Sequence, residues 1–188
     1  MPVPFRDAED IDQLGAAAYL KIDADAAGRV YRGALFFINA RGEPLEFTYS
    51  RVETPNTLLW RKDDLRRHAT RKLTTSLLST ASKTPTLLVC LADEVYHELF
   101  CNEIHLSVPV CRLVSFLKAT AHSGLETEAT VESPEPLNAF WFPGKPPDGS
   151  TEQRLFERLA AHGLLLEPLE RALTGLREAL HDEEADER

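Results

Sequence analysis

The segment Ala17–Val52 constrains the fold of this 188-residue chain more than any other stretch. Its last part alternates apolar and polar residues, its middle part contains the apolar run LFFI, and glycine-bearing turns separate the parts. Alternation with a period of two and glycine turns are typical of β-hairpins, and a continuous apolar run is typical of a strand covered on both faces. The segment therefore predicts three successive strands, Ala18–Asp23, Val30–Asn39 and Leu45–Val52, with the second inside a sheet.

The rest of the chain alternates between helical and extended patterns. A helix is predicted from about Leu58 or Asp63 to Thr80, because small or leucine side chains recur every four residues along it. The apolar run Thr86–Ala92 is typical of a buried strand, and a helix that connects two strands places them in parallel. We therefore expect Thr86–Ala92 to lie parallel to Ala18–Asp23. The further predicted elements are a helix at Glu94–Phe100, extended chain at His105–Leu113, short strands at Thr127–Glu132 and Ala139–Phe142, and helices from Thr151 to Gly163 and from Pro168 to about Leu180.

These elements predict an α/β or α+β fold built on a mixed sheet, with an antiparallel three-strand start and flanking helices. A chain of 188 residues fits one domain with a buried core. We expect a mixed-sheet core at residues 1–118 and a proline-rich loop extension at 119–150. A C-terminal helical pair at 151–182 is expected to pack on the core, followed by an acidic tail at 183–188.

Composition excludes several classes of function. No apolar run approaches the ~20 residues of a membrane helix, and the acidic N-terminus does not resemble a signal peptide, so we expect a cytoplasmic protein without membrane contact. A net charge of −9 argues against broad, non-specific binding to nucleic acid. The chain has no P-loop, dinucleotide fingerprint or G-x-S-x-G motif. Its three cysteines are expected to be buried, reduced thiols.

The order of elements within residues 17–93 carries a family resemblance. The first strand ends at Asp23, the segment Glu53–Lys62 forms a turn and the start of a helix, and the next strand ends near Asp93. This order resembles endonuclease V, a family with the ribonuclease H-like fold. In that family an aspartate ends the first strand, a PYIPG-like turn leads into a helix that opens with F-R-E, and a V-D-G motif ends the following strand. The resemblance implies a ribonuclease H-like fold.

The same resemblance implies a chemistry that this chain only partly supports. The family uses three carboxylates that converge on two divalent ions. Asp23 stands in place, but Lys62 replaces the glutamate of the helix and Asp93 lacks the adjacent glycine. We therefore expect a catalytically silent binding or scaffold subunit, without a cofactor, in a larger nucleic-acid-processing assembly. The alternative is a magnesium- or manganese-dependent nuclease that uses Asp23 and Asp93 with Asp63 or Asp64.

A dense basic stretch marks the start of the predicted helix. It can be a solvated face that balances nearby acids, or a contact for phosphate or an acidic protein, because arginine suits bidentate anions. Nucleic acid would then be contacted through this stretch or through a partner. The residues are Arg61, Lys62, Arg66, Arg67, Arg71 and Lys72.

His97, Cys101 and His105 are spaced four residues apart, and imidazole with thiolate suits zinc. Paired C-x-x-C spacing is missing, so the other interpretation is a half-buried helix with an ordinary cysteine.

The last helix carries a stripe of leucines at intervals of three and four residues. Burying one leucine is worth ~1.5–3 kcal/mol, so the stripe must cover either the domain's own sheet or the surface of a protein partner. Two heptads are too few for an independent coiled coil, which needs ~3–4. The stripe comprises Leu166, Leu169, Leu173, Leu176 and Leu180.

Overall fold

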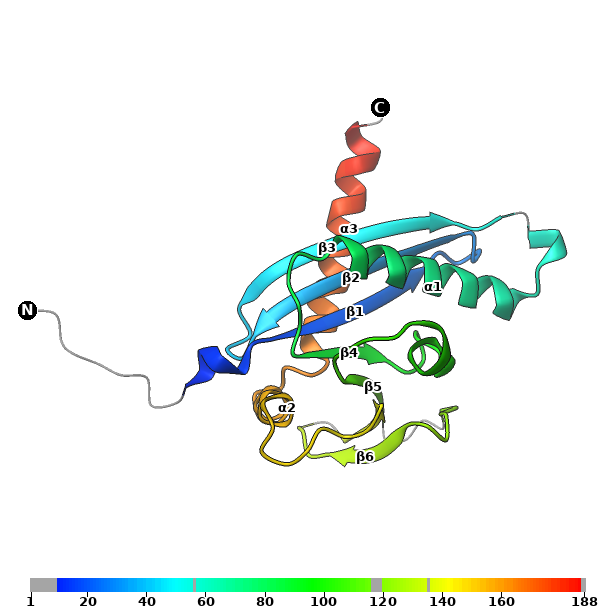
Figure 1. The fold of residues 1–188 in the computed structure, drawn as a ribbon. Coiled ribbons are helices and arrows are strands. Elements are labelled where there is room, and N and C mark those ends of the chain that lie inside the picture. The colour runs from blue at the N-terminus through cyan, green and yellow to red at the C-terminus, as the bar shows by residue number, and fades with distance from the viewer. Residues whose placement is uncertain (1–9, 56, 116–119, 135, 187–188) are drawn as a thin grey trace, which may run out of the picture.

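The computed structural model describes residues 10–55, 57–115, 120–134 and 136–186. Its centre is a mixed sheet of seven strands (Figure 1). The strands are β1 Ala16–Ala24, β2 Val30–Asn39, β3 Pro44–Glu53, β4 Leu87–Leu91, β5 Val110–Ser115, β6 Thr127–Val131 and β7 Leu137–Phe142. Their order across the sheet is β3-β2-β1-β4-β5-β7-β6.

The pairing of the strands confirms the predicted fold class. β2 pairs antiparallel with both β1 and β3, and β4 lies parallel to β1 on its other side. β5 continues the parallel part, and β7 and β6 follow in antiparallel orientation. The chain is thus an α/β protein whose sheet begins with an antiparallel three-strand unit.

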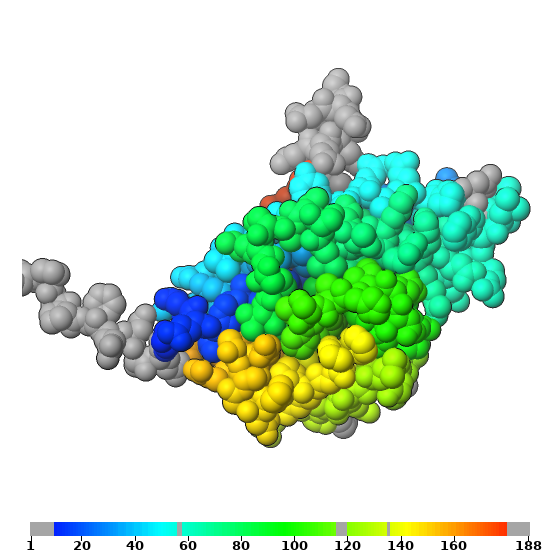
Figure 2. Space-filling model, viewed as in Figure 1, coloured from blue at the N-terminus to red at the C-terminus, as the bar shows by residue number. Residues whose placement is uncertain are grey.

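Helices cover both faces of this sheet. Helix α1 (Lys62–Thr80) lies on one face together with the residues that follow β4, and Figures 1 and 2 view the molecule from this side. Helices α2 (Thr151–Ala161) and α3 (Glu167–Asp186) cover the other face. Short helical turns complete the structure at η1 (Ile11–Leu14), η2 (Thr57–Leu59) and η3 (Leu99–Glu103). No helix in the described ranges is both long and apolar enough to cross a membrane.

The alternation of side chains along the strands divides the core into two layers. Leu20 and Phe37 pack beneath α1 with Leu73, and all three are fully buried. Tyr19 and Trp141 pack beneath α2 and α3. Because β1 and β2 are covered on both faces, apolar residues occupy successive positions in them. This is the physical reason for the LFFI run.

The predicted helix at Glu94–Phe100 is wrong. The residues after β4 form a turn, and the only helical segment there is η3. In a helix the carbonyl of Val95 would accept from the amide of Leu99. Here that carbonyl accepts from Arg112 Nε at 3.0 Å, and Leu99 N donates to Tyr96 O instead.

Several predicted boundaries also shift. Of the two predicted starts of helix α1, the structure favours the one near Asp63, because the helix begins at Lys62. Strand β5 begins after Pro109, which has no N–H to donate to a neighbouring strand. Ser150 caps α2, because its Oγ accepts from Gln153 N at 3.2 Å. Helix α3 continues past Leu180 to Asp186, so it includes most of the acidic tail, and residues 187–188 lie outside the described chain.

The proline-rich segment 119–150 contributes two strands to the sheet, at the places where the sequence predicts short strands. Strand β7 in this segment pairs with β5 along its whole length. Its residues Leu137, Ala139 and Trp141 are buried in the layer beneath α2 and α3. The aromatic cluster around Trp141 is therefore part of the core.

The leucine stripe of α3 covers the domain's own sheet over much of its length. Leu169 and Leu176 are 2% and 1% exposed and belong to the core layer beneath α3. Leu166 and Leu173 are half-buried, and Leu166 packs against the same layer. The side chain of Leu180 lies outside the described side chains.

A buried ion pair joins β5 to the loop before β6. Arg112 Nη1 donates to both carboxylate oxygens of Glu126, at 2.8 and 3.0 Å, and these side chains are 3% and 1% exposed. The same guanidinium donates to the carbonyls of Val95 and Ala92, at 3.0 and 3.3 Å. One side chain thus holds both ends of the turn that follows β4.

We expect Arg112→Met to destabilise the protein by about 3–5 kcal/mol, because it leaves the Glu126 carboxylate buried without its partner. Urea unfolding followed by circular dichroism measures this change in the free energy of unfolding. Arg61→Met is the matched control, since its pair with Asp64 is exposed, and it should cost no more than about 0.5 kcal/mol. Equal effects of the two substitutions would contradict the assigned role of Arg112.

Candidate functional site

The carboxyl ends of the parallel strands β1, β4 and β5 meet at one edge of the sheet, where ligands bind in many α/β proteins. Two cavities open at this edge. The α3 cavity has a volume of about 570 Å³ and is walled by residues of α3. The α1 cavity has a volume of about 340 Å³ and is walled by the start of α1 and the turn after β1.

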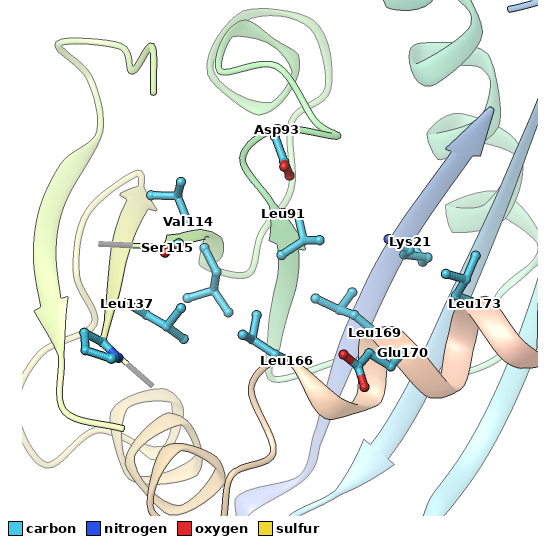
Figure 3. A pocket seen from close by; sticks show the side chains of 12 residues that line it. Lys21, Leu91, Asp93, Val114, Ser115, Leu137, Leu166, Leu169, Glu170 and Leu173 are labelled. Carbon is cyan, nitrogen blue, oxygen red and sulfur yellow. The ribbon is translucent and has the colours of Figure 1, made fainter. Parts of the chain in front are cut away.

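The α3 cavity has an apolar interior. Figure 3 shows leucine side chains from β4, β7 and α3 gathered in its centre, with the carboxylates of Asp93 and Glu170 on either side of them. Lys21 reaches it from β1, next to Leu173 of α3. Its remaining lining comes from the end of β5. The apolar residues that line it are Leu91, Leu113, Val114, Pro136, Leu137, Leu166, Leu169 and Leu173.

An ion pair links the two cavities. Lys21 lines the α3 cavity and Glu94 lines the α1 cavity, and their charged groups are in direct hydrogen-bond contact. The second oxygen of Glu94 accepts from the backbone N–H of Ile22 at 3.0 Å. Burial raises the pKa of the Glu94 carboxyl above its ordinary value, and the Lys21 ammonium opposes this shift. The carboxylate of Glu94 is therefore committed to contacts within the protein.

The structure does not bring the four predicted carboxylates into one site. Asp23 lines the α1 cavity, whereas Asp93 lines the α3 cavity. Asp63 is exposed in the first turn of α1, and Asp64 in the same turn pairs with Arg61 at 2.6 Å. Among the described residues, no three His, Cys, Asp or Glu side chains lie together in a way that could hold a metal ion.

Four of the six predicted basic residues pair with other groups of this chain. Arg61 binds Asp64, and the guanidinium of Arg66 donates to the carbonyl of Asp93. Arg67 pairs with Glu98 at 3.2 Å, and Arg71 lies 3.9 Å from a carboxylate oxygen of Glu103. Of the remaining two, Lys62 lines the α1 cavity and Lys72 is exposed on α1.

The proposed zinc ligands are not assembled into a site. His97 lies 3.3 Å from a carboxylate oxygen of Glu98, and His105 is exposed in the loop after η3. Cys101 is buried within η3, and burial raises the pKa of its thiol, which favours the protonated form. All three cysteines of the chain are free and buried.

The sequence analysis missed the ion pair at the centre of this region. Lys21 interrupts an apolar strand, and a lysine in a buried strand requires an anionic partner, so the sequence YLKI carried a usable signal. It gave no indication that the partner is Glu94, which lies 73 residues away.

A second missed feature is the loop between β3 and α1, which projects from the end of the sheet (Figures 1 and 2). Leu58 and Leu59 in this loop are 87% and 93% exposed. Trp60 follows them and packs against His68, with ring centroids 5.2 Å apart. We name residues 58–60 the apolar tip.

Replacing Lys21 tests the electrostatics of the ion pair. Because the pKa of Glu94 is raised, its carboxyl group keeps its proton to a higher pH in the folded state than in the unfolded chain. The contribution of Glu94 to stability therefore falls as pH rises. Lys21→Met raises this pKa further. Its destabilisation should therefore be small near pH 5 and grow to about 2–3 kcal/mol near pH 8.

Urea unfolding across this pH range measures the effect. The double variant Lys21→Met with Glu94→Gln should lose the growth with pH, because no carboxyl remains to ionise. A destabilisation by Lys21→Met that is independent of pH would show that Glu94 does not depend on Lys21.

Comparison with known proteins identifies the fold. The sequence matches no protein-family model and none of the curated proteins. The structure is similar to endonuclease V from Bacillus subtilis, with a TM-score of 0.58, 10% identity, and coverage of 98% of this chain and 88% of that one. It is also similar to endonuclease V from Streptomyces avermitilis, with a TM-score of 0.55, 12% identity, and coverage of 89% and 82%. The fold of this chain is thus similar to that of endonuclease V, as the order of elements in residues 17–93 predicts.

Proposed function

We propose that this chain is a catalytically silent binding subunit of a nucleic-acid-processing assembly, with a fold shared with endonuclease V. The nucleic-acid context rests on the similarity of fold to proteins named as endonucleases. The proposed lack of catalytic activity rests on one observation, the ion pair of Lys21 and Glu94 at the carboxyl ends of β1 and β4.

A two-metal nuclease needs convergent anions at this edge of the sheet. Here the carboxylate of Glu94 is neutralised by Lys21, and two more cations, Lys62 and Arg66, line the same α1 cavity. Asp23 and Asp25 line the same cavity, where Asp25 accepts from the backbone N–H groups of Arg29 and Val30, and Asp93 lines the α3 cavity instead. The cations balance the carboxylates of the α1 cavity, so it lacks the excess of free carboxylates that two divalent metal ions need.

Binding to a protein accounts for the surface better than direct binding to nucleic acid. Arginines that would contact phosphates are paired at the surface with Asp64, Glu98 and Glu103, so their positive charge is partly neutralised by neighbouring carboxylates. The apolar tip, in contrast, exposes two complete leucine side chains. Exposed apolar groups of this kind mark protein interfaces. Nucleic acid would then be reached through the partner.

The proposal predicts that magnesium and manganese neither bind tightly nor support cleavage. Neither metal should raise the melting temperature beyond the effect of a monovalent salt of equal ionic strength. Single- and double-stranded DNA and RNA should remain intact after prolonged incubation with either metal.

A nuclease would give the opposite pattern. Metal-dependent turnover that is lost in Asp23→Asn and kept in the exposed control Asp148→Asn would overturn the proposal. It would assign the chain to the divalent-metal nucleases.

A further inference from the structure

A second cavity lies beside the α3 cavity. It has a volume of about 200 Å³ and shares Leu137, Leu166 and Glu170 with the first. Both cavities are lined by residues at the amino-terminal half of α3 and by residues of the sheet. We name the two adjacent cavities together the α3 groove.

The floor of the α3 groove is apolar. Leu166 and Leu173 are half-buried, so each keeps part of its surface open in the folded chain. They lie beside Leu91 and Leu137, which come from two strands of the sheet. Apolar surface that stays open in a concave site stabilises a bound apolar group, because binding removes both surfaces from water.

The rim of the α3 groove is acidic. Asp93 and Glu170 line the larger cavity, and Glu167 lines the smaller one. Among the described residues, the only cation in either lining is Lys21, whose charge is balanced by Glu94. Glu167 is paired with Arg171 at 2.7 Å, and the other carboxylates of the lining are those of Asp93 and Glu170. The groove therefore presents net negative charge around an apolar floor.

This charge decides between possible occupants. Phosphate groups of nucleic acid would meet Glu170, which is exposed on α3, without a free cation in the described lining to compensate. A peptide with apolar side chains and arginine or lysine complements both the floor and the rim. Recognition of a peptide in a groove by alternating apolar anchors and charged neighbours is a common mode of protein binding.

We propose that the α3 groove binds a peptide segment of a partner protein, and that this segment carries apolar anchors flanked by arginine or lysine. The inference rests on the proposed binding function and specifies the chemistry of the partner. Leu173 and Leu166 contact the anchors, and Glu170 pairs with a basic flanking residue.

A library of short random-sequence peptides, displayed in a cell-free system and selected against the full chain, tests this assignment. Enriched peptides should combine apolar residues with arginine or lysine. Synthetic copies are then titrated by fluorescence anisotropy against wild type and two groove variants, Glu170→Lys and Leu173→Gln. Each variant should weaken binding by about tenfold or more, because it reverses a rim charge or makes the floor polar.

Matched controls separate the groove from the rest of the surface. Glu178→Lys makes the same charge change at an exposed position of α3, and Leu125→Gln makes the same polar change at a leucine that is 58% exposed. Both should bind the peptides as wild type does. Circular dichroism confirms that all four variants are folded.

Three results would overturn the inference. They are a selection that enriches no peptide, peptides that are acidic or bind all variants equally, and displacement of the peptide from the groove by single-stranded DNA or RNA. None of these results depends on cleavage or metal binding, so the proposed lack of catalytic activity is tested independently of the groove.

Discussion

The burial of β1 on both faces is the constraint on which the rest of the structure depends. Tyr19 and Leu20 are successive residues, both are fully buried, and they face opposite layers of the core. The sheet must therefore carry helices on both sides, α1 on one and α3 on the other. A polar group in such a strand is stabilised by a partner within the protein, because little water reaches it. Lys21, whose side chain is 12% exposed, is one such group, and Glu94 is its partner.

A second buried charge fixes where this partner lies. Arg112 binds the carbonyls of Ala92 and Val95, which bracket the turn that carries Asp93 and Glu94. Glu126 in turn holds Arg112 in place. The position of the Glu94 carboxylate beside Lys21 is thus set by a chain of buried contacts that runs through β5. The cost of burying these two ion pairs in one small region is offset because each joins opposite charges and also makes hydrogen bonds to the backbone, through Glu94 in one pair and Arg112 in the other.

These contacts define which side chains lie at the edge where the parallel strands end. The strands and helices follow the arrangement of endonuclease V, yet cations and leucines occupy much of the edge where the parallel strands end. A fold supports many functions, and the side chains at its sites decide among them. At this edge the electrostatics disfavour metal ions on the α1 side, and on the α3 side they disfavour phosphates. We infer that binding, rather than catalysis, is the role of this region.

The sequence by itself determined the first four strands, their pairing and the class of fold. Alternation in Leu45–Val52 indicates a strand buried on one face, and the continuous apolar run in β2 indicates a strand buried on both faces. Both patterns are local properties of the chain. The sequence also located Asp23 and Lys62, although it did not indicate that they line the same cavity. Only the tertiary structure decided that Asp23 and Asp93 line different cavities. The tertiary structure also decided that a turn at Glu94 replaces a predicted helix and that Lys21 pairs with Glu94. These depend on contacts between residues far apart in the chain, through Arg112 above all, and no local pattern encodes such contacts.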